Sequence, residues 1–404
     1  MSPLRFACVV GARPNFMKMA PILDALKQYQ HVETVLVHSG QHYDQQLSDV
    51  FFEELGMRRP DVCLDVGSGR HGEQTARVLE RFEAFLTAGA GSGGGFDRVI
   101  VVGDVNTTMA AALASVKLGV PVAHVEAGLR SFDRSMPEEI NRIVTDSVSD
   151  MLFVSEPAGM DNLRREGHEE HDLHLVGNVM IDTLVRLLPR AQNNGTLSHY
   201  GLRPGAYGVV TLHRPSNVDD AANLSSLVGV LLEAARELPF VFPVHPRTQH
   251  RLERFGLSDR LRRAAGMILV PPLGYLDFLA LSSQARLVIT DSGGLQEEST
   301  VLGIPCLTMR AHTERPVTVE QGTSTLVGND PRRLGMLIRT IIGNAYKQGS
   351  APSLWDGKAA GRIAKVLAAG ERPRSGGADT TSLRPAVTGN EHEVPRQGGG
   401  RRWD

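Results

Sequence analysis

The feature that most constrains the fold is an alternation of short β-branched runs with helical patterns, which runs through the chain twice. The first series predicts strands at 4–10, 32–37, 98–102, 120–125 and 151–154, with helices near 16–28, 44–55, 71–87, 106–118 and 137–149. The second follows the polar stretch 190–207 and predicts strands at 208–212, 240–244, 267–270, 286–290 and 304–308. Such alternation favours parallel sheets covered by helices on both faces. We therefore predict an α/β chain with two doubly wound, Rossmann-like domains and a ligand cleft between them.

The length of the chain agrees with two domains. Its 404 residues exceed what one hydrophobic core usually supports. We place an N-terminal domain at 1–188 and a C-terminal domain at 189–369. Residues 370–404 are polar and rich in Pro and Gly, which predicts a disordered tail, and "AGAGSGGG" (88–95) predicts a flexible loop.

Composition excludes several classes of partner. A net charge of −2 gives no electrostatic basis for binding nucleic acid or an anionic membrane. There is no apolar run of the length that spans a bilayer, and the N-terminus reads as a strand rather than a signal peptide. Cys8, Cys63 and Cys306 are odd in number and lack C-x-x-C spacing, which indicates a reducing cytoplasm.

Two apparent motifs carry no weight. Gly89, Gly91 and Gly94 form G-x-G-x-x-G, but the motif lies after a helix and before a strand, the reverse of a dinucleotide site. "HEEHDLH" (168–174) does not have the H-E-x-x-H spacing of a zinc helix and lies in a polar connection. We expect neither a metal nor a nicotinamide cofactor.

Polar side chains follow the predicted strands, where a doubly wound sheet binds its ligand. The first domain contributes both cations and acids, namely Arg13, Lys18, Asp104 and Glu126. The second contributes mainly cations and a helix start, namely His213 with Arg214, His245 with Arg247, and Ser292, Gly293 and Gly294. Free N–H groups and the positive end of the helix dipole make such a start a phosphate site, and Glu298 lies one turn further, spaced to reach a sugar hydroxyl.

One stretch, "VPVAHVEAGLRSFDRSMPEEINR" (120–142), gathers acids at a strand-to-helix turn. Ser135 and Glu138 have the spacing of a capping box, and Glu138 with Arg142 that of a helical ion pair. We expect Glu126 to point into the cleft, and Glu138 to cap its helix, face the ligand and be oriented by Arg142. Acids in one domain and cations in the other suit a substrate with a pyrophosphate at one end and a carbon centre needing acid/base chemistry at the other, which is a nucleotide-sugar.

Eight short sequence segments together resemble one known family. In order along the chain they are "GARPNFMKMAP", "GQHYD", "VVGDVNTT", "HVEAGLRSFDRSMPEEINR", "GNVMIDTL", "TLHRPSN", "TDSGGLQEE" and "TERPVTVEQGT". Together they resemble the non-hydrolysing UDP-N-acetylglucosamine 2-epimerases over about four fifths of the chain. The resemblance implies a glycosyltransferase-B architecture, a homodimer, and an isomerase that interconverts UDP-GlcNAc and UDP-ManNAc without metal or nicotinamide, for the supply of cell-surface polysaccharide precursors.

The resemblance also assigns residues. It implies acid/base roles for Asp104, Glu126 and Glu138, with Arg142 and His213 as catalytic cation and histidine. It implies that the UDP-sugar is contacted by Arg13, His245, Ser292, Gly293, Gly294, Glu298 and Arg315. We add Lys18 to these predicted contacts.

The sequence departs from the family pattern at two places. "RPSN" follows His213 where many members carry Arg-Arg-Glu, and Glu73 stands where some members carry an arginine that binds an activating second UDP-GlcNAc. We therefore expect that form of activation to be absent.

Several alternatives stay open. They are C2 epimerisation of a related UDP-2,3-diacetamido uronic acid, a hydrolysing epimerase that releases ManNAc, a glycosyltransferase of the same fold, and a UDP-sugar binding protein. The sequence also leaves open the sugar's substituents at C3, C4 and C6, and the division of proton transfers among the three acids.

Overall fold

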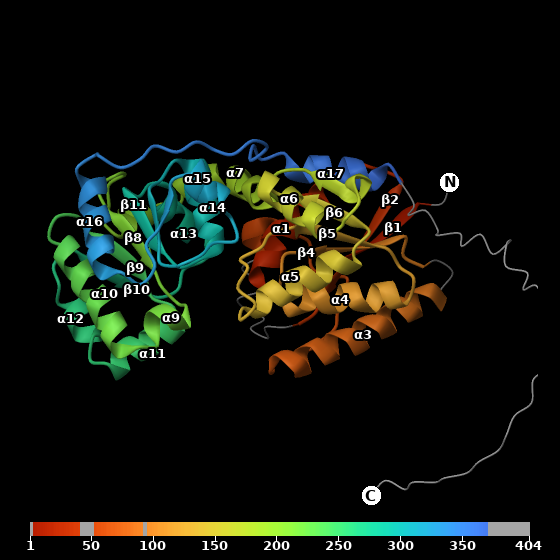
Figure 1. Ribbon diagram of the computed structural model, residues 1–404, viewed down its shortest axis with the longest axis horizontal. Helices are drawn as coiled ribbons and strands as arrows, with labels where there is room; N and C mark the ends of the chain where they lie inside the picture. Colours follow the sequence, from red (N-terminus) through yellow and green to blue (C-terminus); the bar gives the residue numbers. More distant parts are fainter. Residues whose placement is uncertain (1–2, 41–51, 92–94, 371–404) are drawn as a thin grey trace, which may run out of the picture. The chain divides into compact units, whose positions relative to one another are not determined.

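The computed structural model describes residues 3–40, 52–91 and 95–370. The first half of the chain is built on a seven-stranded parallel sheet (Figure 1). The strand order is β3-β2-β1-β4-β5-β6-β7. Its central strands are mainly apolar and are buried on both faces, as is typical of parallel sheets. The strands are β1 (Leu4–Val10), β2 (Val32–His38), β3 (Val62–Cys63), β4 (Arg98–Val102), β5 (Val122–Ala127), β6 (Met151–Val154) and β7 (Leu173–Leu175).

Helices cover the two faces of this sheet. One group consists of α3 (His71–Gly91), which packs on α4 (Asn106–Lys117), and α5 (Pro137–Val148), which packs on the other side of α4. A second group consists of α1 (Arg13–Leu26), which packs against α7 (Val179–Gln192) and against the last helix, α17 (Ala359–Ala368). The short α6 (Pro157–Arg165) follows β6. The strands of this sheet all run parallel, so their carboxyl ends meet the same edge.

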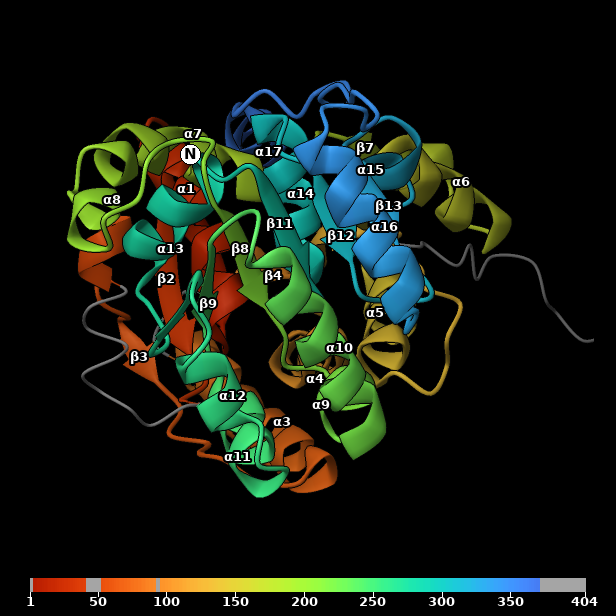
Figure 2. The same cartoon turned by 90° about the vertical axis from the view of Figure 1, so that its left-hand side faces the viewer.

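The second half repeats the scheme with a six-stranded parallel sheet in the order β10-β9-β8-β11-β12-β13 (Figure 2). The strands are β8 (Gly208–Thr211), β9 (Phe240–Pro243), β10 (Met267–Val270), β11 (Leu287–Thr290), β12 (Cys306–Thr308) and β13 (Ser324–Leu326). The helices are α8 (Thr196–His199), α9 (Pro215–Val218), α10 (Ala221–Ala234), α11 (Pro246–Arg254), α12 (Ser258–Arg262), α13 (Tyr275–Ser283), α14 (Gly293–Leu302), α15 (Val317–Glu320) and α16 (Pro331–Ile342). The prediction of two doubly wound parallel sheets is confirmed.

Local sequence explains where many helices begin. A proline stands in the first turn of α1, α5, α6, α9, α11 and α16, where its missing N–H costs nothing and its fixed φ suits the helix. Asn178, Asp220 and Asp330 cap α7, α10 and α16 by accepting a backbone N–H.

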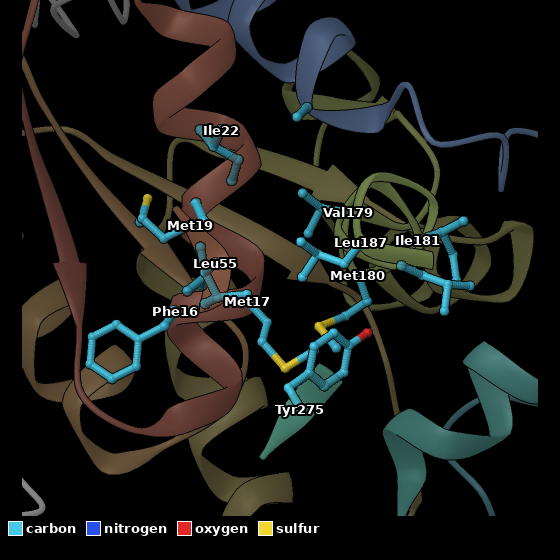
Figure 3. Close-up of a cluster of buried hydrophobic side chains, with 14 of the residues drawn as sticks. Phe16, Met17, Met19, Ile22, Leu55, Val179, Met180, Ile181, Leu187 and Tyr275 are labelled. Carbon is cyan, nitrogen blue, oxygen red and sulfur yellow. The ribbon is translucent and has the colours of Figure 1, made fainter. Parts of the chain in front are cut away.

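One hydrophobic core contains residues from both series of elements. Met17 of α1, Met180 of α7 and Tyr275 of α13 converge in it (Figure 3). After α16 the chain returns to the first half of the structure and forms α17. The start of α17 is held there by Asp182 of α7, which accepts the backbone N–H groups of Ala359 and Ala360. The domain boundaries at 188 and 369 stay predictions.

The main differences from the predicted elements lie at ends and edges. Predicted strands agree with the observed ones to within a few residues, but β3, β7 and β13 were not predicted because runs of two or three residues give no periodic signal. The loop prediction for 88–95 is wrong in part, since α3 continues to Gly91. Part of the predicted helix 44–55, the "QHYD" of "GQHYD", residues 92–94 and the predicted disordered tail beyond 370 lie outside the described residues.

Candidate active site

The candidate site is a cavity of about 460 Å³, a volume typical of small-ligand sites. Its wall is built from the turns after β1 and β4, the start of α5, and the strand ends and helix starts of the second sheet. Every predicted site residue except Glu126 lines it, namely Arg13, Lys18, Asp104, Glu138, Arg142, His213, His245, Ser292, Gly293, Gly294, Glu298 and Arg315. The sequence argument therefore collects the right strand ends into one place.

Glu126 lies behind the cavity wall, so the prediction that it points into the cleft is wrong. It is the penultimate residue of β5 and lies in the left-handed region, with φ 74°, at a register shift between β5 and β6. Bulges of this kind re-aim a side chain. The carboxylate pairs with Lys18 on one oxygen and with Arg315 Nη2, at 2.7 Å, on the other. Burial raises the pKa of Glu126, but the two cations lower it more, so the net shift is downward.

Arg315 is held by three carboxylates. Besides Glu126 it contacts Glu297 through Nε and Glu314 through Nη1, the latter at 2.5 Å. Burial opposes the charge of Arg315, and the surrounding carboxylates outweigh it and raise the pKa well above its usual value. The sequence argument named Arg315 but missed Glu297 and Glu314, both of which line the cavity. No local pattern marked them, since their partners lie far along the chain or in an irregular turn.

Arg142 is buried and joins two acids, but Glu138 is not one of them. Its Nη1 donates to Asp104 at 2.5 Å, and its Nη2 donates to Glu139 at 2.6 Å. Burial lowers the pKa of Arg142, and Asp104 and Glu139 together raise it above the ordinary value. The predicted orientation of Glu138 by Arg142 is therefore wrong, and Arg142 instead fixes Asp104 at the cavity.

The predicted capping box is also wrong. The N-cap of α5 is Met136, and Ser135 lies one residue too early, where its hydroxyl donates to Asp133 at 2.6 Å. Glu138 is exposed and lines the cavity, and within the described residues it has no hydrogen-bond or ion-pair partner. It is a carboxylate facing the cavity without a partner on the protein side.

Glu139, which the sequence argument passed over, organises this turn instead. Its buried carboxylate accepts the backbone N–H groups of Ser131 (2.9 Å) and Phe132 (2.8 Å) and the hydroxyl of Ser131 (3.0 Å). It also binds Arg142 through two nitrogens, at 2.6 and 3.0 Å. Burial raises the pKa of Glu139, but these donors hold it below the ordinary range. Adjacent glutamates on one helix thus have different surroundings, because one faces the cavity and the other the preceding turn.

On the opposite wall, His213 is oriented by a buried acid. Asp291 accepts the backbone N–H groups of His213 and Arg214 and pairs with His213 Nδ1 at 2.8 Å. Burial raises the pKa of Asp291, and His213, Asn217 and the backbone donors lower it below its usual value. An ionised partner at Nδ1 fixes the ring and leaves Nε2 for a ligand.

His245 stands beside His213, with ring centroids 5.5 Å apart. Its Nδ1 accepts the backbone N–H of Arg247, so it begins α11 as the N-cap. Burial and the neighbouring His213 lower the pKa of His245.

The start of α14 has the geometry of an anion site. Ser292 is its N-cap and makes no side-chain cap bond, so the N–H groups of the first turn remain for a ligand. Gly293 is needed here, because a Cβ would lie 2.9 Å from both Arg315 Nη1 and Glu314 Oε1. Further along the helix, Glu298 lines the cavity and accepts a 2.9 Å hydrogen bond from Tyr275 Oη. Burial raises the pKa of Glu298 to about 7.

Neither a metal cluster nor a membrane-spanning segment is found in residues 3–40, 52–91 and 95–370. No group of three or more His, Cys, Asp or Glu side chains in these ranges is arranged to hold a metal ion. In the same ranges, no helix is both long and apolar enough to cross a membrane.

We compared the chain with known protein families and with individual proteins, and both comparisons identify the same family. The family model described as UDP-N-acetylglucosamine 2-epimerase matches residues 24–368. The UDP-N-acetylglucosamine 2-epimerase of Methanocaldococcus jannaschii is 39% identical over 373 residues, which are 91% of this chain and 100% of that protein. The UDP-2,3-diacetamido-2,3-dideoxy-D-glucuronate 2-epimerase of Pseudomonas aeruginosa is 40% identical over 369 residues, 90% of this chain and 99% of that protein.

Solved structures of the same family are similar to this chain in fold. The M. jannaschii enzyme in complex with UDP-GlcNAc and UDP has a TM-score of 0.81 at 39% identity, covering 90% of this chain and 99% of that one. The Neisseria meningitidis UDP-GlcNAc 2-epimerase bound to UDP-GlcNAc has a TM-score of 0.80 at 26% identity, with 90% and 99% coverage. The predicted two-domain architecture and the predicted family are both confirmed. The chain belongs to the UDP-N-acetylglucosamine 2-epimerase family.

Proposed function

We propose that this enzyme interconverts UDP-GlcNAc and UDP-ManNAc without hydrolysis. The observation that carries the proposal is a single cavity with two chemically different walls. Asp104 and Glu138 present carboxylates on one wall, and His213, His245 and the start of α14 present imidazoles and free N–H groups on the other. A sugar C2 facing the carboxylates and a pyrophosphate facing the helix start fit this division.

The chemistry explains why both walls are needed. C2 of an acetamido sugar has no adjacent carbonyl, so removing its proton requires a simultaneous outlet for the electron pair. Breaking the anomeric C1–O bond provides it: the C2–H electrons form the C1–C2 double bond, and UDP leaves with the C1–O electrons. Adding a proton to the opposite face of C2 and UDP back to C1 inverts the centre. Positioned acids on both faces and fixed positive charge around UDP meet these demands.

We assign roles from the contacts. Glu138 is the unpaired carboxylate that exchanges a proton at one face of C2, and Asp104, fixed by Arg142, serves the other face. Glu126 holds Lys18 and Arg315 in the wall, and one of its two ion pairs must open before it accepts a proton. Arg13, His245 and the start of α14 hold UDP, and Glu298 accepts from a ribose hydroxyl.

Proton NMR of UDP-GlcNAc with the purified protein in D2O tests the proposal. We expect deuterium at C2 of both epimers, an approach to equilibrium between them, and equal activity after dialysis against EDTA. Release of free ManNAc would identify a hydrolysing enzyme instead. Activity restored only by zinc would contradict the metal-free mechanism.

A second candidate substrate follows from one comparison, because the P. aeruginosa relative named for a 2,3-diacetamido uronic acid is as similar as the enzymes named for UDP-GlcNAc. The same NMR assay, carried out with the UDP-2,3-diacetamido uronic acid, distinguishes the two substrates. If the enzyme turned over the uronic acid nucleotide but not UDP-GlcNAc, our proposal would be wrong and the uronic acid nucleotide would be the substrate.

We further propose that the enzyme acts as a cytoplasmic homodimer that supplies polysaccharide precursors. The family resemblance supports the dimer, and three unpaired cysteines, Cys8, Cys63 and Cys306, agree with a reducing compartment. Light scattering after size-exclusion chromatography measures the oligomeric state, and a monomer mass would overturn the first part.

A further inference from the structure

A fully buried histidine lies behind the cavity and takes no part in the chemistry described above. His124 is on β5, and both of its ring nitrogens have partners. Nδ1 lies 2.6 Å from Asp146 Oδ1, and Nε2 lies 2.8 Å from the carbonyl oxygen of Gly103. The two partners belong to different elements, Asp146 to α5 and Gly103 to the turn after β4.

Both ring nitrogens of His124 face acceptors. A carbonyl oxygen only accepts, so Nε2 carries a hydrogen. Asp146 already accepts the backbone N–H of Gly128 at 3.0 Å and pairs with Arg130 at 2.7 Å, so it too is an acceptor. Burial raises the pKa of Asp146, but His124 and Arg130 lower it more, and the carboxylate is ionised. The ring therefore bridges two acceptors that belong to different elements.

Arg130 connects the His124–Asp146 pair to the protein surface. It contacts the buried Asp146 and donates through Nε and Nη2, at 2.8 and 2.6 Å, to Glu166, which is exposed. The ring of His124 itself is 0% exposed, so water does not compete for either of its contacts.

The Gly103 carbonyl that His124 holds belongs to the residue immediately before Asp104. Gly103 has φ 69°, and a Cβ there would lie 2.8 Å from Lys18 Nζ, so the turn passes between His124 and the Lys18–Glu126 pair. Asp146, on the other side of the ring, belongs to the same helix as Glu138. The His124 ring thus joins the turn that carries one cavity acid to the helix that carries the other.

We propose that His124 is a positioning residue that fixes Asp104 relative to Glu138 by clamping the Gly103 carbonyl to Asp146 of α5. This inference rests on the proposed function for its kinetic consequence. It concerns the distance between two acids that must address opposite faces of one carbon, and a misplacement of about 1 Å far from the reacting atoms can cost about 10²-fold in rate.

Two substitutions separate the two contacts of the ring. The amide of asparagine reaches about as far as Nδ1, so His124→Asn keeps a donor for Asp146 and loses the contact to Gly103. The amide of glutamine reaches about as far as Nε2, so His124→Gln keeps a donor for Gly103 and loses the contact to Asp146. Asp182→Asn is a matched control, since Asp182 is also a buried acid that accepts two backbone N–H groups but lies away from the cavity.

Three readouts are compared: kcat per folded molecule for C2 exchange, UDP affinity by calorimetry, and amide hydrogen exchange of residues 103–105. We expect His124→Asn to lower kcat by about 10- to 100-fold with UDP affinity retained, and to speed exchange at 103–105. We expect His124→Gln to retain much more activity than His124→Asn, and Asp182→Asn to keep the wild-type kcat.

The outcomes are distinguishable from failure of the proposed function. Wild-type turnover of UDP-GlcNAc tests the function alone, whereas hydrogen exchange at 103–105 tests the clamp even in an enzyme with another sugar substrate. Equal kcat values for both His124 variants, or unchanged exchange at 103–105 in His124→Asn, would overturn the clamp. A variant that does not fold is replaced in the comparison by Asp146→Asn, which weakens the same clamp from the α5 side and is expected to speed exchange at 103–105.

Discussion

The adjacent glutamates Glu138 and Glu139 offer a sharp test of the site, because the same substitution is expected to have opposite effects. Glu138→Gln changes an exposed carboxylate that has no hydrogen-bond or ion-pair partner among the residues the structure describes, so the free energy of unfolding should not change. If Glu138 exchanges the C2 proton, turnover and deuterium incorporation should fall by about 10²–10⁴-fold. UDP affinity should be retained, since we assign UDP binding to Arg13, His245 and the start of α14 rather than to Glu138.

Glu139→Gln should instead destabilise the fold. The carboxylate accepts five hydrogen bonds, from Ser131 N and Oγ, Phe132 N, and Arg142 Nε and Nη2. A glutamine oxygen can replace Oε2, but its NH₂ group then faces the Phe132 N–H, so one buried donor loses its acceptor at a cost of about 1–3 kcal/mol. Arg142 also loses its buried counter-charge and keeps only Asp104, which is partly exposed. Removing one member of a buried ion pair typically costs about 3–5 kcal/mol, which we take as the expected loss.

Urea unfolding followed by circular dichroism, together with the NMR exchange assay, measures both effects on both variants. The pH dependence adds a check on sign. Because the pKa of Glu139 is lowered on folding, its contribution is present above the ordinary glutamate value of 4.5 and is lost as pH falls through the lowered one. The acid limb of the stability profile should therefore flatten in Glu139→Gln. Normal turnover in Glu138→Gln, or wild-type stability in Glu139→Gln, would refute this account of the turn.

Three further predictions concern the opposite wall. Asp291→Asn removes the ionised partner of His213 Nδ1 and should lower kcat by about 10²-fold per folded molecule; an unchanged kcat would show that His213 needs no orienting acid. Glu298, whose pKa of about 7 leaves it largely neutral at pH 6, should bind UDP roughly tenfold more weakly at pH 6 than at pH 8, and calorimetry should find this dependence abolished in Glu298→Gln. Gly293→Ala places a Cβ 2.9 Å from Arg315 Nη1 and should weaken UDP binding more than it slows turnover; wild-type affinity would contradict a close approach at this helix start.

The sequence by itself determined the architecture and which strand ends contribute to the cavity. Apolar runs alternating with helical patterns place the strands, and the carboxyl ends of parallel strands meet at one edge whatever the details of packing. Residues such as Asp104, His213 and Ser292, which directly follow a strand, are therefore brought to one cavity by topology alone. The short β3, β7 and β13 escaped prediction because their existence depends on a neighbouring strand rather than on their own pattern.

Only the tertiary structure decided which charges pair. Spacing along α5 favoured Glu138 as the partner of Arg142, yet Glu139 takes that place because its side chain faces the preceding turn. Glu126 faces away from the cavity because Arg315, 189 residues further on, pairs with it from the second half of the chain. Ion pairs of this kind depend on burial and on the approach of distant elements, and neither is encoded in the local spacing of residues.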